Sequence, residues 1–123
     1  MAYTLLSNKK NGKTTLYFSA ALGNAVVNIA GNNAVSDIAI FDEILTSGNI
    51  NMATWGTDSG SVQVLRGANT VLVLSGSGHQ NYVSTGVSLT NDNNASLVVN
   101  FVGTSNAHLI INIQKVGILP TTY

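Results

Sequence analysis

The sequence predicts an all-β protein, an antiparallel β-sandwich that is jelly-roll-like and forms a single domain over residues 1–123. Short apolar runs recur at spacings of roughly 8 to 12 residues with turn residues between them, which is typical of sandwiches and jelly rolls rather than α/β folds. Hydrophobic residues make up 45% of the chain and charged residues only 8%. Its surface must therefore consist largely of uncharged polar side chains. No linker or low-complexity segment divides the chain, which indicates one core.

The clearest element is a hairpin over residues 61–75, SVQVLRGANTVLVLS. Gly and Asn in its connecting segment tolerate the positive φ angles of a tight reversal. In the first arm, Val62 and Val64 alternate with polar residues, as in a strand with one wet face. The second arm, 71–74, is apolar on both faces. Such a strand must lie between two layers, either inside a sandwich or against another subunit.

Before this hairpin, strands are expected at 3–6 and 14–19, joined by a turn with an Asn-Gly pair, and at 24–30. Segment 36–45 is expected to be a strand with a bend near its Asp-Glu pair. A short helix remains the alternative there, because Ile38, Phe41 and Ile44 also have helical spacing.

Another strand is expected at 49–55, with Ile50, Met52 and Thr54 on one face. After the central hairpin, 76–78 is expected to be a loop and 80–89 to hold one or two short strands. Asn and Asp side chains at 91–94 favour a turn, because they can bond their own backbone. The last pair of strands is expected at 95–102 and 107–116, joined by a hairpin loop at 103–106.

Few residues could carry chemistry. His79 and His108 are the only histidines, and neither stands in a nucleophile motif, so no catalytic residue is predicted. Asp42 and Glu43 are adjacent and would point to opposite faces of a strand, which disfavours a carboxylate pair for glycoside hydrolysis. No metal site and no cofactor are expected. The chain has no cysteine, and segment 91–94 lacks the remaining acidic ligands of a calcium loop.

Charge and hydropathy also limit the partners. The formal net charge is zero, so we expect no nucleic-acid partner. The chain has no basic helix, no secretory signal pattern and no apolar run of about 18 residues, so no membrane partner is expected. A monomer with so little charge and so many apolar strand faces would tend to associate. The sequence therefore predicts a protein that works in an assembled state.

Four stretches together carry a resemblance to a known class of proteins: Trp55-Gly56, the hairpin and glycines of 62–78, and the apolar runs 95–99 and 109–111. In these stretches the chain resembles small structural proteins encoded in the virion-assembly regions of tailed phages. The resemblance covers roughly the last two thirds of the chain. It implies a non-enzymatic capsid decoration or cement protein, located in the virion, that binds across joints between major capsid proteins.

The expected partners are therefore the major capsid protein and the protein itself, as a homodimer or homotrimer. The core is expected to contain Val71, Val73, Leu97, Val99, Leu109 and Ile111. The alternate residues are expected to cover a second layer or subunit: Leu72, Leu74, Val98 and Ile110. Contact with the capsid is expected through the N-terminal segment at Lys13 or through the tail from Ile118 to Tyr123, because termini are free to dock on a neighbour.

The alternative is a carbohydrate-binding β-sandwich module, or the head domain of a phage fibre or tail protein. It would require a concave groove with an exposed Trp55 or Tyr82, since aromatic rings stack on sugar faces, together with Asn and Asp side chains. The exposure of these two rings distinguishes the alternatives.

Overall fold

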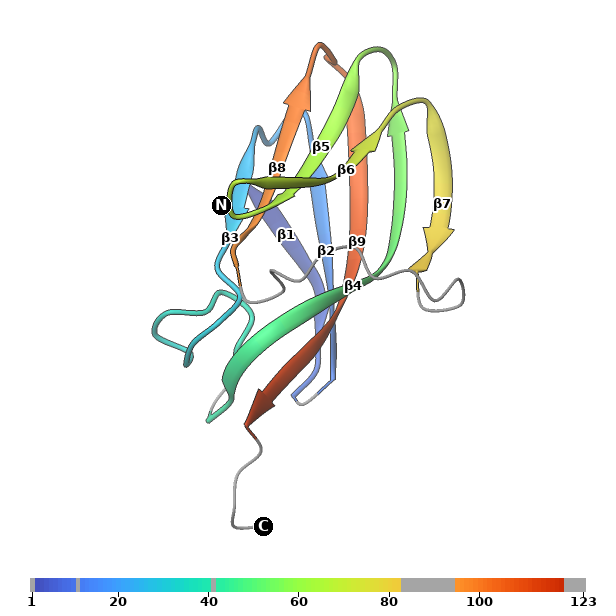
Figure 1. The fold of residues 1–123 in the computed structure, drawn as a ribbon. Coiled ribbons are helices and arrows are strands. Elements are labelled where there is room, and N and C mark those ends of the chain that lie inside the picture. Colours follow the sequence, from blue (N-terminus) through green and yellow to red (C-terminus); the bar gives the residue numbers. More distant parts are fainter. Residues whose placement is uncertain (1, 11, 41, 83–94, 119–123) are drawn as a thin grey trace.

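A computed structural model describes residues 2–10, 12–40, 42–82 and 95–118. Within these residues the chain is nearly all β, as predicted, and forms two antiparallel sheets that pack as a sandwich (Figure 1). The strands are β1 (Tyr3–Asn8), β2 (Lys13–Ser19), β3 (Ala25–Val27), β4 (Ile44–Thr57), β5 (Ser61–Arg66), β6 (Asn69–Leu74), β7 (Ser77–Asn81), β8 (Leu97–Val102) and β9 (Ala107–Ile118). One sheet has the order β1-β2-β9-β4-β7 and the other the order β3-β8-β5-β6.

The strand pairing is nested around the central hairpin. β5 pairs with β6, and outward from this pair β4 pairs with β7, β3 with β8 and β2 with β9, all antiparallel. The chain thus resembles one long hairpin whose tip is the β5–β6 turn. Two further pairings, β4 with β9 and β5 with β8, close this hairpin into the two sheets.

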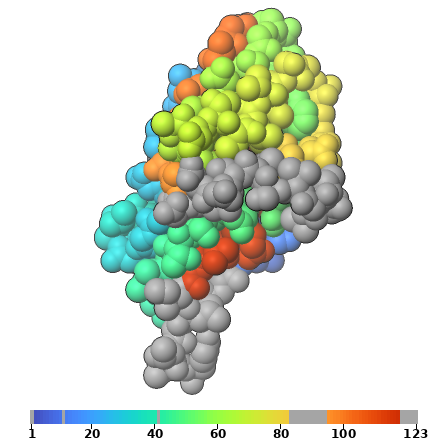
Figure 2. Space-filling model, viewed as in Figure 1, coloured from blue at the N-terminus to red at the C-terminus, as the bar shows by residue number. Residues whose placement is uncertain are grey.

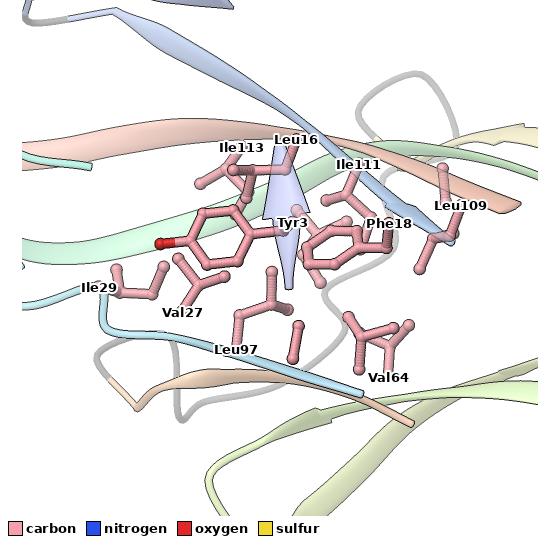
Figure 3. Packing of buried hydrophobic residues seen from close by; sticks show 14 of the residues in the cluster. Tyr3, Leu16, Phe18, Val27, Ile29, Val64, Leu97, Leu109, Ile111 and Ile113 are labelled. Atoms are coloured by element: carbon pink, nitrogen blue, oxygen red, sulfur yellow. The ribbon is translucent and has the colours of Figure 1, made fainter. Parts of the chain in front are cut away.

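The core lies between the two sheets (Figure 3). Leu16, Leu109, Ile111 and Ile113 come from the five-stranded sheet, while Val27, Val64 and Leu97 come from the four-stranded sheet. Tyr3 and Phe18 fill the space between them, with their ring centroids 6.0 Å apart. Alternate residues of each strand therefore point inward, as expected of a sandwich.

The central hairpin is confirmed, but the inward-facing residues of its second arm were assigned wrongly. Val73, expected in the core, is 62% exposed, whereas Leu74 is only 6% exposed. The cause is the register. Leu74 pairs with the buried Val62, and directly paired residues of antiparallel strands share a face. Val71 is the extra residue of a β-bulge and packs against the core at half burial.

Segment 36–45 is neither the expected strand nor the alternative short helix over its described residues, except that β4 begins at Ile44. Side chains bond the local backbone instead. The Ser36 hydroxyl accepts the amides of Ile38 and Ala39, and the Glu43 carboxylate accepts the Ile40 amide at 2.8 Å. Such local bonds compete with a strand ladder. The segment still contributes Ile38 to the core, where it is fully buried.

A second bulge corrects the expected faces of strand 49–55. Ile50 points into the core, but the register shifts between Ile50 and Met52, so that Ala53 is the next core residue. Met52 and Thr54 therefore point outward, not to the side of Ile50. A one-residue shift exchanges the two faces of a strand.

Only some of the other expected elements are found in the structure. The β1–β2 hairpin and the short strand β3 are confirmed. Strands β8 and β9 form where they were expected, but the hairpin between them is wrong, because β8 belongs to the four-stranded sheet and β9 to the five-stranded sheet. Loop 103–106 therefore crosses from one sheet to the other. Residues 77–78, expected in a loop, belong to β7. Of the segment 80–89, where one or two strands were expected, residues 80–81 belong to β7 and residues 83–89 lie outside the described residues. The turn expected at 91–94 and Tyr123 in the expected tail also lie outside them.

Candidate functional site

The placement of the few charged side chains shapes the whole surface. Nine of the ten charged residues are described, and three of them are buried: Glu43, Arg66 and Lys115. Burial of an ionised side chain requires a partner, because the charge loses its hydration. Both buried cations have such partners.

Lys115 of β9 and Glu43 form an ion pair at 2.8 Å whose side chains are each 1% exposed. The Lys115 ammonium also donates to Asn8 Oδ1 at 2.8 Å and to the Ile38 carbonyl at 3.2 Å. Asn8 in turn accepts from the hydroxyl of the buried Thr14 at 2.7 Å. The network ties loop 36–43 to β9 and to the β1–β2 hairpin.

Arg66 ends β5 and points into the sandwich rather than into solvent. Its guanidinium donates to the Gly48 carbonyl at 2.7 Å and to the Ala95 carbonyl at 3.0 and 3.3 Å. Arg66 is the only charged residue on the four strands of its sheet. Its four strands therefore place no charged side chain on the outer face of the sheet.

This outer face combines apolar and uncharged polar side chains. Alternation and register place five apolar residues on it: Val26, Leu65, Val73, Val98 and Val102. Ser61, Gln63, Thr70 and Asn100 lie among them, and we call the whole surface the valine face. Val26 is 56% exposed and Val102 is 45% exposed. The β5–β6 hairpin, yellow-green in Figure 2, occupies much of the surface seen there.

The outer face of the five-stranded sheet is uncharged over most of its area. Tyr17, Ile110 and Thr54 form one row across β2, β9 and β4, and all three are half-buried. Lys13, at the start of β2, is the only charged residue that alternation places on this face within the described strands. Most remaining charges lie at the ends of the sandwich, such as the Lys10–Asp42 ion pair.

A pocket of about 640 Å³ opens on this second face, at the end of the sandwich where four loops gather. Each of these loops connects one sheet to the other: β2–β3, β4–β5, β6–β7 and β8–β9. We call it the loop-end pocket. It is lined by polar side chains from strand ends and loops, among them Tyr17, Ser77, Asn106 and His108.

Hydrogen bonds fix two walls of the loop-end pocket. The Asp58 carboxylate accepts the hydroxyls of Thr104 and Ser105 at 2.7 and 2.9 Å, and the Asn106 amide at 3.3 Å. These donors, Thr104 first, hold the pKa of Asp58 well below its ordinary value. On another wall, the Gly76 amide donates to the Thr57 hydroxyl at 2.9 Å. The walls are therefore ordered without a ligand.

The two histidines lie on the outer face of the five-stranded sheet and have different neighbours. The His79 Nδ1 lies 2.6 Å from the Thr54 hydroxyl. The His108 imidazole lies over Gly56, where a Cβ would approach its Cε1 to 2.7 Å. Across the described ranges, no group of three or more Asp, Glu and His side chains could hold a metal ion.

The aromatic residues of the carbohydrate alternative lie elsewhere than that hypothesis required. Trp55 is half-buried against the core, its ring lies beside Gly78, and its Nε1 donates to the Ser75 carbonyl at 3.1 Å. Tyr82 is buried, and burial raises the pKa of its hydroxyl. Tyr82 is therefore not exposed as a sugar platform, and Trp55 is exposed only in part.

Some of the residues predicted for an interface point outward, and others lie in the core of the single chain. Val98 and Ile110 point outward from opposite sheets, and Lys13 is exposed. Leu74 lies in the core of a single chain and Leu72 packs against it. Ile118 ends β9. The loop-end pocket was not predicted, because its residues come from strand ends that only the topology brings together.

Comparison with known proteins identifies no relative. No protein-family model matches the chain, and neither a curated protein nor a solved structure matches it. In the portion that the structure describes, there is no helix long and apolar enough to cross a membrane.

Proposed function

We propose that this chain is a non-enzymatic virion structural protein of the capsid decoration type, which binds the major capsid protein and copies of itself. The observation that carries the proposal is the valine face, an exposed sheet surface without a charged side chain. Charged residues are depleted in the cores of stable protein interfaces, where apolar area supplies most of the free energy. Monomeric soluble proteins rarely expose a large apolar surface of this kind.

We further assign the sandwich to the jelly-roll type. The nested pairing supports this assignment, because without β1 the remaining eight strands form two four-stranded sheets in the orders β2-β9-β4-β7 and β3-β8-β5-β6. Jelly rolls occur in viral capsid proteins and in lectins. This likeness concerns the fold alone, and function must come from the surfaces.

The two kinds of contact are assigned to different surfaces. The valine face mediates self-association into a dimer or trimer, with Val98 within the buried area. The N-terminal segment at Lys13 and the tail that follows β9 contact the capsid. Each copy would bury about 800 Å² at a stable contact, and repetition over a shell multiplies the stabilisation.

Native mass spectrometry and sedimentation with capsids that lack the protein test the proposal. We expect the wild-type chain to form a dimer or trimer and to sediment with the capsids. Val73→Lys places a charge on the valine face, at a side chain exposed enough to leave the core intact. This variant should be monomeric with an unchanged melting temperature.

Thr4→Lys is the matched control, because Thr4 is exposed on the other sheet and faces outward with Tyr17. It should assemble like the wild type. A wild-type chain that stays monomeric at high concentration and does not sediment with capsids would refute the proposal. Loss of assembly in Thr4→Lys but not in Val73→Lys would move self-association to the five-stranded sheet.

A further inference from the structure

The loop-end pocket lies apart from the valine face, on the other sheet, and the assembly function makes no use of it. Its volume of about 640 Å³ falls within the range of roughly 300–1,000 Å³ that ligand pockets occupy. Loops at one end of a rigid sandwich are also where binding residues usually gather. The pocket can therefore hold a small ligand.

Its lining restricts the chemistry of that ligand. The lining residues include no Lys, Arg, Asp or Glu, so neither an anion nor a cation finds an opposite charge. The adjacent Asp58 carboxylate is already engaged by three donors of the β8–β9 loop. A purely apolar ligand is disfavoured, because it would remove water from hydroxyl and amide groups without replacing their hydrogen bonds.

The polar groups present match a neutral, hydroxyl-rich molecule. Hydroxyls come from Tyr17, Ser19, Thr57, Ser77 and Ser105, and Asn106 and His108 add an amide and an imidazole. A hydroxyl side chain both donates and accepts, as do the hydroxyls of a sugar. The ring of Tyr17 and the ring of His108 offer apolar surface to the C–H face of a pyranose.

The backbone at the pocket allows close approach. Gly76 lines it and has a φ of 69° with no atom within 4 Å of where its Cβ would lie, whereas Gly56 is covered by the His108 ring. Glycine often stands where a ligand lies directly against the main chain. Because the walls are already fixed through Asp58 and Thr57, little ordering free energy opposes binding.

We propose that the loop-end pocket is a binding site for a neutral saccharide. The site is distinct from the aromatic groove that the sequence suggested at Trp55 and Tyr82. Ser77 and Asn106 hydrogen-bond the sugar hydroxyls from opposite walls, and Tyr17 or His108 packs against the ring. The saccharide site and the valine face act independently.

The test uses the full chain. An array of neutral and sialylated oligosaccharides is followed by NMR titration of the labelled protein with galactose, glucose, mannose and N-acetylglucosamine at millimolar concentrations. We expect array binding to be confined to neutral glycans. Chemical-shift changes should be centred on Ser77, Asn106 and His108.

Ser77→Ala and His108→Ala should each weaken binding by about 3- to 10-fold, the loss expected for one hydrogen bond or ring contact. The matched controls are Ser7→Ala and His79→Ala, since both side chains are exposed on the same sheet but do not line the pocket. They should bind like the wild type. Val73→Lys should also bind normally, which separates this site from the assembly function.

Three outcomes would overturn the saccharide assignment. One is the absence of any array signal or shift with the four sugars. A second is a shift map centred away from the pocket, or binding of sialylated glycans alone. The third is capsid binding that Ser77→Ala and His108→Ala abolish while no sugar has any effect, which would assign the pocket to a protein contact.

Discussion

The buried ion pair of Lys115 and Glu43 gives the sharpest test of how this fold is stabilised. Lys115→Met removes the ammonium but keeps a long apolar stem of similar length. Most acceptors of the ammonium keep another donor: Asn8 Oδ1 retains the Thr14 hydroxyl, and the Ile38 carbonyl retains the Asn8 side-chain amide. The substitution therefore chiefly isolates one effect, a buried carboxylate without its cation.

We expect Lys115→Met to lower the free energy of unfolding by about 3–5 kcal/mol, the usual cost of breaking a buried ion pair from one side. For a domain of this size that corresponds to a fall of roughly 10–20 °C in Tm. Glu43→Leu combined with Lys115→Met should recover most of the loss, because no unpaired charge then remains inside.

Equilibrium unfolding in urea, followed by the fluorescence of the single tryptophan Trp55, measures these differences. The control is Lys10→Met, which breaks the exposed ion pair of Lys10 and Asp42. Water screens that pair, so its loss should have little effect. If Lys115→Met were no more destabilising than Lys10→Met, the buried pair would not stabilise the fold as argued.

Three further predictions concern the hairpins and the ends of the sandwich. Gly60→Ala should lower the free energy of unfolding by about 2–4 kcal/mol, because φ is 64° and a Cβ would overlap the carbonyl oxygen of the last residue of β8. Gly76→Ala, with open space around the Cβ position, should lower it by only about 1 kcal/mol. Chemical denaturation measures both values, and equal losses would contradict the steric reason. Leu74→Ala should lower the free energy of unfolding by about 2–4 kcal/mol, because Leu74 is buried, and Val73→Ala should lower it by less than about 0.5 kcal/mol, because Val73 is exposed. The reverse order in thermal unfolding would show that the register of β6 is wrong. The pKa of Asp58 is depressed in the folded state, so its contribution to stability is present above pH 3.8 and is lost as the pH falls below that value. Asp58→Asn should therefore make the free energy of unfolding less dependent on pH below pH 4. An unchanged pH dependence would exclude the hydrogen-bonded carboxylate as its source.

The hairpins were predictable because their signals are local. Asn-Gly and Gly-containing turns between apolar runs identified β1–β2 and β5–β6. The same kind of signal at 103–106 did not mark a hairpin, because that loop joins strands of different sheets. The inward face of β6 could not be derived from the turn alone, because an unbroken register from Arg66 and Asn69 would place Val71 and Val73 opposite Val64 and Val62. The β-bulge at Val71 shifts the register, so that Leu72 and Leu74 face the core instead. Segment 36–45 could not be predicted in the same way, because its conformation depends on Ser36 and Glu43 bonding nearby amides.

The sequence by itself determined the class of fold and the scarcity of charge, because strand periodicity, turn residues and composition are properties of short stretches. Only the tertiary structure decided where the charges lie. Glu43, Arg66 and Lys115 are buried with partners far away in the chain, and because Arg66 points inward, the strands of the four-stranded sheet place no charge on its outer face. The loop-end pocket likewise exists only because nested pairing brings four loops to one end, and no local pattern records which strand ends will meet.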